Sequence, residues 1–227
     1  MSRRMPSDPA RLREEIAQAA ARMIAEDGAD YATAKRKAAR QVLGDIRVAG
    51  EWLPDNDMIE DEVRAYQALF QSEHQPRILA LLRQLALLAM DDLAAYRPYL
   101  VGAVLNGTAS EHSDVYLQCF CDSPKDVALH FLNAGVDFDT SESRHFAGRA
   151  DVETLSFLWR GQWPASREAR QLAGEVRSTF GAPVGIHVAL YDAGDERGAA
   201  RADATGRPAR ADLKAVRALV DETNAAQ

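Results

Sequence analysis

The residues that could best bind a phosphate group and a metal ion lie in one stretch, 100–120. Within it, Gly107-Thr108 forms a candidate turn, and Asp114 follows where a second strand opens. A glycine at the end of a strand lets a ligand approach the backbone closely, because it carries no side chain. The next segment, Thr108–Glu111, could form one helical turn whose free N–H groups face an anion. The stretch therefore predicts a phosphate site with a metal ion beside it.

The candidate site residues follow from this interpretation. The phosphate loop and its further ligand contact comprise Gly107, Thr108, Ser110 and His112. Asp114 is the candidate catalytic residue and metal ligand. The alternative interpretation of the same pattern is an ordinary strand–turn–strand connection with a polar residue at its edge.

Two strands should position this loop. Before the turn, the apolar run 100–105 suits a strand that is covered on both faces. After the turn, alternation divides the residues between two faces of a strand. One face carries Asp114, Tyr116, Gln118 and Phe120, and the other carries Val115, Leu117, Cys119 and Cys121.

The chain before this stretch is predicted to be helical. The first helix begins at Asp8-Pro9, an N-cap with proline at the first helical position, and ends at Gly28. A second helix covers about 32–43, and a capping box at Asp57–Glu60 opens a third. Pro76 begins the most apolar helix, which ends before Pro98. We therefore expect a helical module over residues 1–96.

The chain after the stretch alternates helices and strands. The predicted helices cover about 123–135, 166–180 and 212–221, and the predicted strands cover 136–140, 152–159 and 184–191. The fold class is α+β, with residues 97–227 forming a small sheet of four or five strands.

Composition limits the classes of partner. The 227 residues carry a net charge of −7, which argues against general coating of nucleic acid. A local basic cluster, formed by Lys35, Arg36, Lys37 and Arg40, is either a solvated helix face or a contact for RNA or another phosphate-bearing ligand. No apolar run is long enough to span a bilayer, and no signal peptide is evident. We expect a cytoplasmic protein with two reduced cysteines and no membrane partner.

Gly107-Thr108 followed by Ser113-Asp114-Val115 resembles the polymerase-beta type of nucleotidyltransferase superfamily, whose motif is a Gly-Ser or Gly-Thr loop followed by Asp-x-Asp. A longer likeness, over most of residues 10–190, is to a proteobacterial group of minimal nucleotidyltransferase-like proteins. It is carried by the segments Tyr31–Ala39, Glu62–Tyr66, Arg97–Leu100 and Ser113–Gln118. The resemblance implies a mixed sheet, a nucleoside triphosphate on the Gly-Thr loop, and Mg²⁺ on the carboxylates.

The sequence departs from that catalytic pattern after Asp114. Tyr116 occupies the position of the second carboxylate, and His187 lies near that of the third. Two-metal phosphoryl transfer needs several carboxylates to neutralise the ions, although acids on neighbouring strands could substitute. These are Asp137, Asp139 and Glu153.

Two functions remain open. The first is transfer of a nucleotidyl group from a nucleoside triphosphate to an unknown acceptor. The second is a catalytically inactive nucleotide-binding or protein-interaction module that retains the fold. The pair Asp114 and His187, if close together, could act as a base or bind a transition metal. No Gly-x-Ser-x-Gly motif occurs, so the sequence does not indicate a serine hydrolase.

Overall fold

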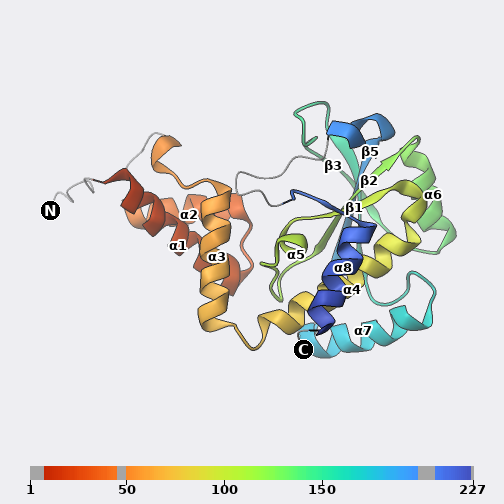
Figure 1. The fold of residues 1–227 in the computed structure, drawn as a ribbon. Helices are drawn as coiled ribbons and strands as arrows, with labels where there is room; N and C mark the ends of the chain where they lie inside the picture. Colours follow the sequence, from red (N-terminus) through yellow and green to blue (C-terminus); the bar gives the residue numbers. More distant parts are fainter. Residues whose placement is uncertain (1–7, 45–49, 199–207, 226–227) are drawn as a thin grey trace. The chain divides into compact units, whose positions relative to one another are not determined.

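A computed structural model describes residues 8–44, 50–198 and 208–225, and divides the chain into two compact units, Met1–Gln75 and Pro76–Gln227 (Figure 1). We expected the division after residue 96. The boundary falls earlier because the buried side chains of the most apolar helix belong to the same core as the sheet.

The first unit is helical. It contains α1 (Pro9–Asp27), α2 (Tyr31–Leu43), the 3-10 turn η1 (Gly50–Trp52) and α3 (Asn56–Phe70). The Asp8 side chain accepts a hydrogen bond from the Ala10 N–H, and Gly28 ends α1 in the left-handed conformation, as predicted. The third helix is capped by Asp55, whose side chain accepts from the Met58 N–H. The predicted capping box at Asp57 was therefore two residues too late.

The second unit contains a mixed sheet of six strands in the order β3-β4-β5-β2-β1-β6. Its strands are β1 (Pro98–Val101), β2 (Val115–Cys121), β3 (Asp139–Ser143), β4 (Val152–Trp159), β5 (Val184–Asp192) and β6 (Ala211–Asp212). The two central strands, β2 and β5, are parallel, and the other neighbouring pairs are antiparallel. The predicted α+β class is confirmed, with one strand more than expected.

Helices pack against one face of this sheet (Figure 1). They are α4 (Gln75–Asp92), α6 (Pro124–Asn133), α7 (Arg167–Phe180) and α8 (Leu213–Ala225), with short turns η2 (Ala94–Tyr96) and η3 (Ala193–Gly198) elsewhere in the unit. The core between helices and sheet includes Leu82, Leu85, Met90, Leu117, Phe131, Trp159, Ile186 and Val188. The other sheet face carries a smaller buried cluster around Phe120 and Tyr191.

Two predicted strands differ in the structure. The run 100–105 is not a continuous strand, because β1 ends at Val101 and Ala103–Asn106 forms the short helix α5. Gly102 makes this reversal, with φ 74°, a value that favours glycine. The strand predicted at 136–140 begins three residues later, at Asp139. Among the described residues, no helix has the length and apolarity required to cross a membrane.

Candidate functional site

The candidate site lies on the sheet face opposite the helices, where three strands bring polar side chains together. Asp114 immediately precedes β2, and Tyr116 lies opposite His187 of β5 in the parallel pair. Ser156 of β4 lies opposite the same histidine in the antiparallel pair. Because residues paired in register point to the same face, the site contains Asp114, Tyr116, Ser156 and His187.

Asp114 is held by two donors from β5. One carboxylate oxygen, Oδ1, accepts from the Gly185 N–H at 2.8 Å, and Oδ2 lies 3.1 Å from His187 Nε2. The hydrogen bond with His187 holds the pKa of Asp114 below its ordinary value of 3.8, and the Gly185 bond acts in the same direction against partial burial. Asp114 is therefore an ionised carboxylate at neutral pH.

Whenever the His187 ring is neutral, the ionised carboxylate fixes its tautomer. A carboxylate only accepts hydrogen bonds, so Nε2 must carry the proton that is shared with Asp114. The other ring nitrogen, Nδ1, then presents its lone pair, and it lies 2.9 Å from Ser156 Oγ. The Ser156 hydroxyl therefore donates to His187, and three residues form one directed chain from serine to aspartate.

Tyr116 stacks on the His187 ring. The ring centroids lie 4.6 Å apart with an interplanar angle of 15°, and Tyr116 is 47% exposed. Burial of the phenol and the charge of Asp114 raise the pKa of Tyr116, which therefore stays protonated at neutral pH. The pair presents a partly open aromatic surface to a ligand.

The ligand set does not fit a two-metal centre. Tyr116 and His187, which are paired in register beside Asp114 on this face, carry no carboxylate. Among the described residues, no three His, Cys, Asp or Glu side chains are grouped so that they could hold an ion. Glu153 lies on the opposite face from Ser156, because it is three residues away along β4. One carboxylate beside an imidazole supplies too little negative charge for two Mg²⁺ ions.

The predicted phosphate loop is closed by its own hydrogen bonds. Gly107 ends α5 in the left-handed conformation, and the N–H groups of Gly107 and Thr108 both donate to the Ala103 carbonyl. The predicted helical turn at 108–111 is wrong, since these residues form a coil and then a turn. The glycine that directly follows β1 is Gly102, five residues earlier.

The rest of this loop is also occupied internally. The Ser110 N–H donates to Ser113 Oγ, the Ser113 N–H donates to the Ser110 carbonyl, and the His112 N–H donates to Ser110 Oγ. His112 is exposed beside Glu111, with 3.6 Å between Nε2 and Oε1. A phosphate at this loop would have to displace these hydrogen bonds.

A pocket of about 420 Å³ adjoins the directed chain at Ser156. Its other walls come from the end of β4, the start of β3 and the turns beside them. These lining residues are Gly135, Asp137, Phe138, Asp139, Phe157, Leu158, Arg160 and Gln162. Two of the acids that we considered as substitute metal ligands, Asp137 and Asp139, thus line the pocket.

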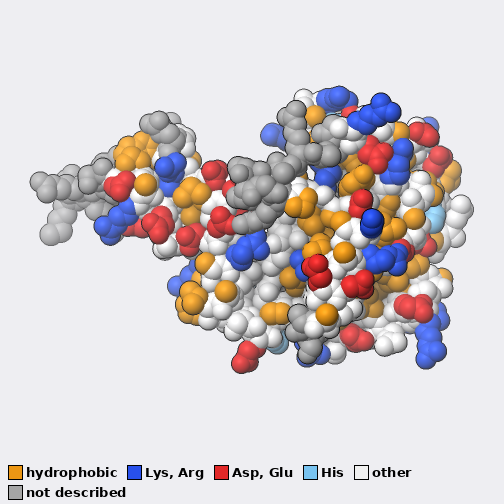
Figure 2. All heavy atoms as spheres, in the orientation of Figure 1, with side chains coloured by type: hydrophobic (Ala, Val, Ile, Leu, Met, Phe, Trp, Pro, Cys, Tyr) orange, Lys and Arg blue, Asp and Glu red, His pale blue; other side chains and the backbone are white. Residues whose placement is uncertain are grey.

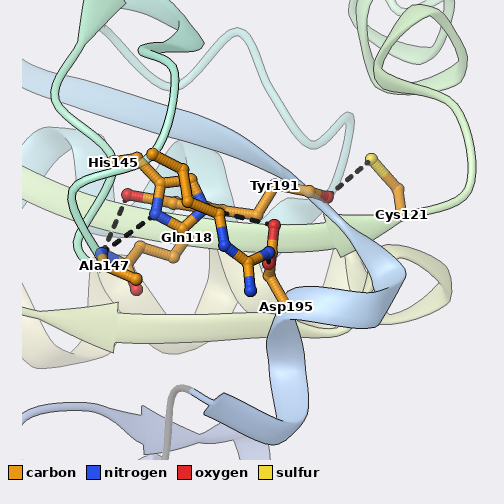
Figure 3. A network of polar contacts seen from close by, with 7 residues as sticks. Gln118, Cys121, His145, Ala147, Tyr191 and Asp195 are labelled. Atoms are coloured by element: carbon orange, nitrogen blue, oxygen red, sulfur yellow. Dashed lines mark hydrogen bonds and ion pairs between the residues drawn. The ribbon is translucent and has the colours of Figure 1, made fainter.

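A second polar cluster lies toward the other end of β5 (Figure 3). The buried ring of His145 receives the Ala147 N–H on Nδ1 at 2.9 Å, and its Nε2 lies 3.1 Å from the buried Asp195 carboxylate. Arg149 also pairs with Asp195. This cluster joins the β3–β4 connection to η3, and its internal bonds assign it a structural role.

The same cluster extends across β2. Gln118 donates to the Tyr191 hydroxyl at 3.5 Å and accepts from Arg210 Nε at 2.9 Å. The Arg210 guanidinium lies 4.2 Å from the centre of the Phe146 ring. These contacts cover the sheet face beyond the Asp114 site with aromatic and amide groups.

The basic cluster lies on α2 of the first unit. Arg36, Lys37 and Arg40 are exposed and Lys35 is half-buried. The buried side of this helix is formed by Ala34, Ala38 and Leu43. Contact of this helix with RNA or another phosphate-bearing ligand stays a prediction.

On the visible face of the second unit, basic and acidic side chains are interspersed (Figure 2).

Sequence reasoning did not identify Ser156 and Gly185 as partners of the site. Alternation along β4 and β5 places Ser156, Gly185 and His187 correctly by face. Alternation does not say which strands pair. The contacts of His187 with Ser156 and with Asp114 span 31 and 73 residues of sequence, so they depend on that pairing.

Comparison with known proteins gave no relative from which to take a function. No protein-family model, curated protein or solved structure matches the chain.

Proposed function

We propose that residues 76–227 form a nucleotidyltransferase-like module that binds a nucleotide without magnesium-dependent nucleotidyl transfer. The observation that carries this proposal is the hydrogen-bonded state of Asp114, whose two oxygens are engaged by Gly185 and His187. The resemblance at residues 107–115 suggests the nucleotide, and the set of ligating groups argues against the metal.

The aromatic pair supports a binding mode that needs no metal ion. Tyr116 lies against His187 with nearly parallel rings and is about half exposed. A nucleobase stacks readily on such a surface, and stacking is worth about 1–3 kcal/mol per base. The site thus favours recognition of the base over recognition of a metal-bound triphosphate.

Thermal unfolding with each of ATP, CTP, GTP and UTP, with and without Mg²⁺, tests this proposal. A nucleotide at about ten times its Kd should stabilise the folded chain by roughly 1.4 kcal/mol. We expect a nucleotide to raise the melting temperature by the same amount without Mg²⁺ and in Asp114→Ala. In Tyr116→Ala the shift should be lost, whereas Leu129→Ala, which removes an exposed side chain from α6, should retain it.

Two results would count against the proposal. Stabilisation that requires both Mg²⁺ and Asp114 would revive the enzymatic alternative, nucleotidyl transfer to an acceptor. No stabilisation by any of the four nucleotides would remove nucleotide binding and leave a protein-interaction module.

A further inference from the structure

We propose that Ser156 is a nucleophile that attacks a small uncharged carboxylic ester, with His187 as its base and Asp114 as the residue that positions His187. The inference concerns metal-independent acyl chemistry and does not depend on nucleotide binding. It rests on the spatial arrangement of three residues from three strands and on the pocket beside one of them.

The three side chains form an unbroken chain of hydrogen bonds. Ser156 Oγ lies 2.9 Å from His187 Nδ1, and His187 Nε2 lies 3.1 Å from Asp114 Oδ2. These are distances at which a base accepts a proton from a nucleophile. The Gly185 N–H fixes the other carboxylate oxygen at 2.8 Å, so Asp114 cannot rotate without losing a second bond.

The protonation pattern is the one that nucleophilic catalysis needs. Asp114 is ionised and accepts the proton on Nε2, so Nδ1 of the neutral ring is free to take a proton from Ser156. When the ring becomes an imidazolium, the carboxylate stabilises its positive charge. Ser156 and His187 are both partly exposed, so a ligand can reach them.

The pocket indicates the class of substrate. Ser156 is part of the wall of the 420 Å³ pocket as well as a partner of His187. The wall combines apolar surface from Phe138, Phe157 and Leu158 with the carboxylates of Asp137 and Asp139. Those carboxylates repel an anionic phosphate, whereas a neutral ester can bury its acyl group against the apolar side chains.

The reaction balances without a metal ion or redox partner. Ser156 Oγ attacks the ester carbonyl as His187 Nδ1 takes the hydroxyl proton. The carbon–oxygen bond to the leaving alcohol then breaks, and His187 returns the proton to that alcohol. Water attacks the acyl-serine with His187 again as base, which releases a carboxylic acid and restores the Ser156 hydroxyl. Arg160 is the cationic side chain among the residues that line the pocket, and it is the candidate to stabilise the oxyanion.

A fluorophosphonate probe tests the nucleophile directly on the full-length chain. Ser156 Oγ would displace fluoride from phosphorus, and the covalent adduct would be located by peptide mass spectrometry. We expect one adduct per chain, at Ser156, and none in Ser156→Ala. The matched control is Ser141→Ala, which removes an exposed serine from β3 and should be labelled like the wild type.

The roles of His187 and Asp114 have separate readouts. His187→Ala should lower the labelling rate by at least about a hundredfold. Asp114→Asn keeps an oxygen for the Gly185 N–H but can donate from its amide to the ring and so favour the wrong tautomer. With p-nitrophenyl acetate, the folded variant should show a roughly hundredfold lower kcat with little change in KM.

Three outcomes would overturn the inference. They are absence of an adduct on the folded wild-type chain, an adduct on another residue, and labelling of Ser156 that is unaffected by His187→Ala. Failure of nucleotide binding would leave the inference intact, because labelling and thermal shift by nucleotide are independent measurements.

Discussion

At the scale of single residues, Asp114 depends on the absence of a side chain at Gly185. A Cβ built on Gly185 would lie 2.6 Å from Asp114 Cγ and 2.7 Å from both carboxylate oxygens. Since contacts this short do not occur, alanine at this position must move the carboxylate. The glycine is required here for close approach between β5 and the residue that precedes β2.

Gly185→Ala is therefore expected to destabilise the fold by about 2 kcal/mol and to separate Asp114 from His187. Urea unfolding measures the first effect. The control is Gly174→Ala, in the interior of α7, where an added Cβ meets nothing within 4 Å. That change should stabilise the helix by about 0.5–1 kcal/mol. Equal effects of the two substitutions would contradict the close approach.

Asp114 should also give the fold a pH dependence. Its pKa is lowered in the folded protein by the His187 and Gly185 hydrogen bonds. A carboxyl group with a lowered folded pKa stabilises the fold above its unfolded pKa, and this contribution is lost as pH falls through the folded value. The wild type should therefore be more stable than Asp114→Asn at neutral pH, and the difference should shrink below pH 3.8, the ordinary value for the group.

The measurement is urea unfolding of both proteins between about pH 7 and pH 2. A difference in unfolding free energy that is constant over this range would mean that the ionised form of Asp114 makes no special contribution. A difference that grows on acidification would contradict the direction of the pKa shift.

At the scale of elements, the His145 cluster joins two connections that the sheet does not hold. His145 is 6% exposed and Asp195 is 7% exposed, so loss of either partner leaves a buried polar group without its contact. One belongs to the β3–β4 connection and the other to η3. The stability of both segments is therefore coupled through one hydrogen bond and the Arg149 ion pair.

His145→Ala should destabilise the second unit by about 3 kcal/mol, because it leaves the Asp195 carboxylate buried with one partner fewer. Hydrogen exchange should become faster in both joined segments, which a purely local effect would not produce. The control is His112→Ala, at an exposed histidine, for which a change within about 0.5 kcal/mol is expected.

At the scale of the whole molecule, α4 decides where the second unit begins. Five large side chains from this part of the chain are almost completely buried in the core of the sheet: Ile78, Leu82, Leu85, Met90 and Leu93. At about 2 kcal/mol each, their burial contributes on the order of 10 kcal/mol. This is similar to the net stability of a typical domain, about 5–15 kcal/mol.

A chain of residues 76–227 should therefore fold by itself, whereas residues 97–227, the domain that we predicted from sequence, should not. Cooperative urea unfolding and dispersed amide signals in NMR spectra would identify the folded chain. Cooperative unfolding of residues 97–227 would show that α4 is dispensable and would restore the boundary after residue 96.

Local features of the sequence determined much of this architecture. Asp8, Pro9 and Gly28 act within a few residues of themselves, so the ends of α1 were predictable. Alternation sorted the residues of β2, β4 and β5 between the two sheet faces, because side chains of a strand point to opposite sides in turn. The presence of Tyr116, and not an acid, two residues after Asp114 was likewise visible without a structure.

The tertiary structure decided how those faces combine. The antiparallel pairing of β4 with β5 places Ser156 opposite His187, and the parallel pairing of β2 with β5 places Tyr116 opposite the same histidine. The contacts of His187 with Ser156 and with Asp114 span 31 and 73 residues, and a strand's periodicity is the same whichever neighbour it pairs with. The sequence therefore supplied the polar residues and their faces, and the register of the sheet joined Ser156, His187 and Asp114 into one site.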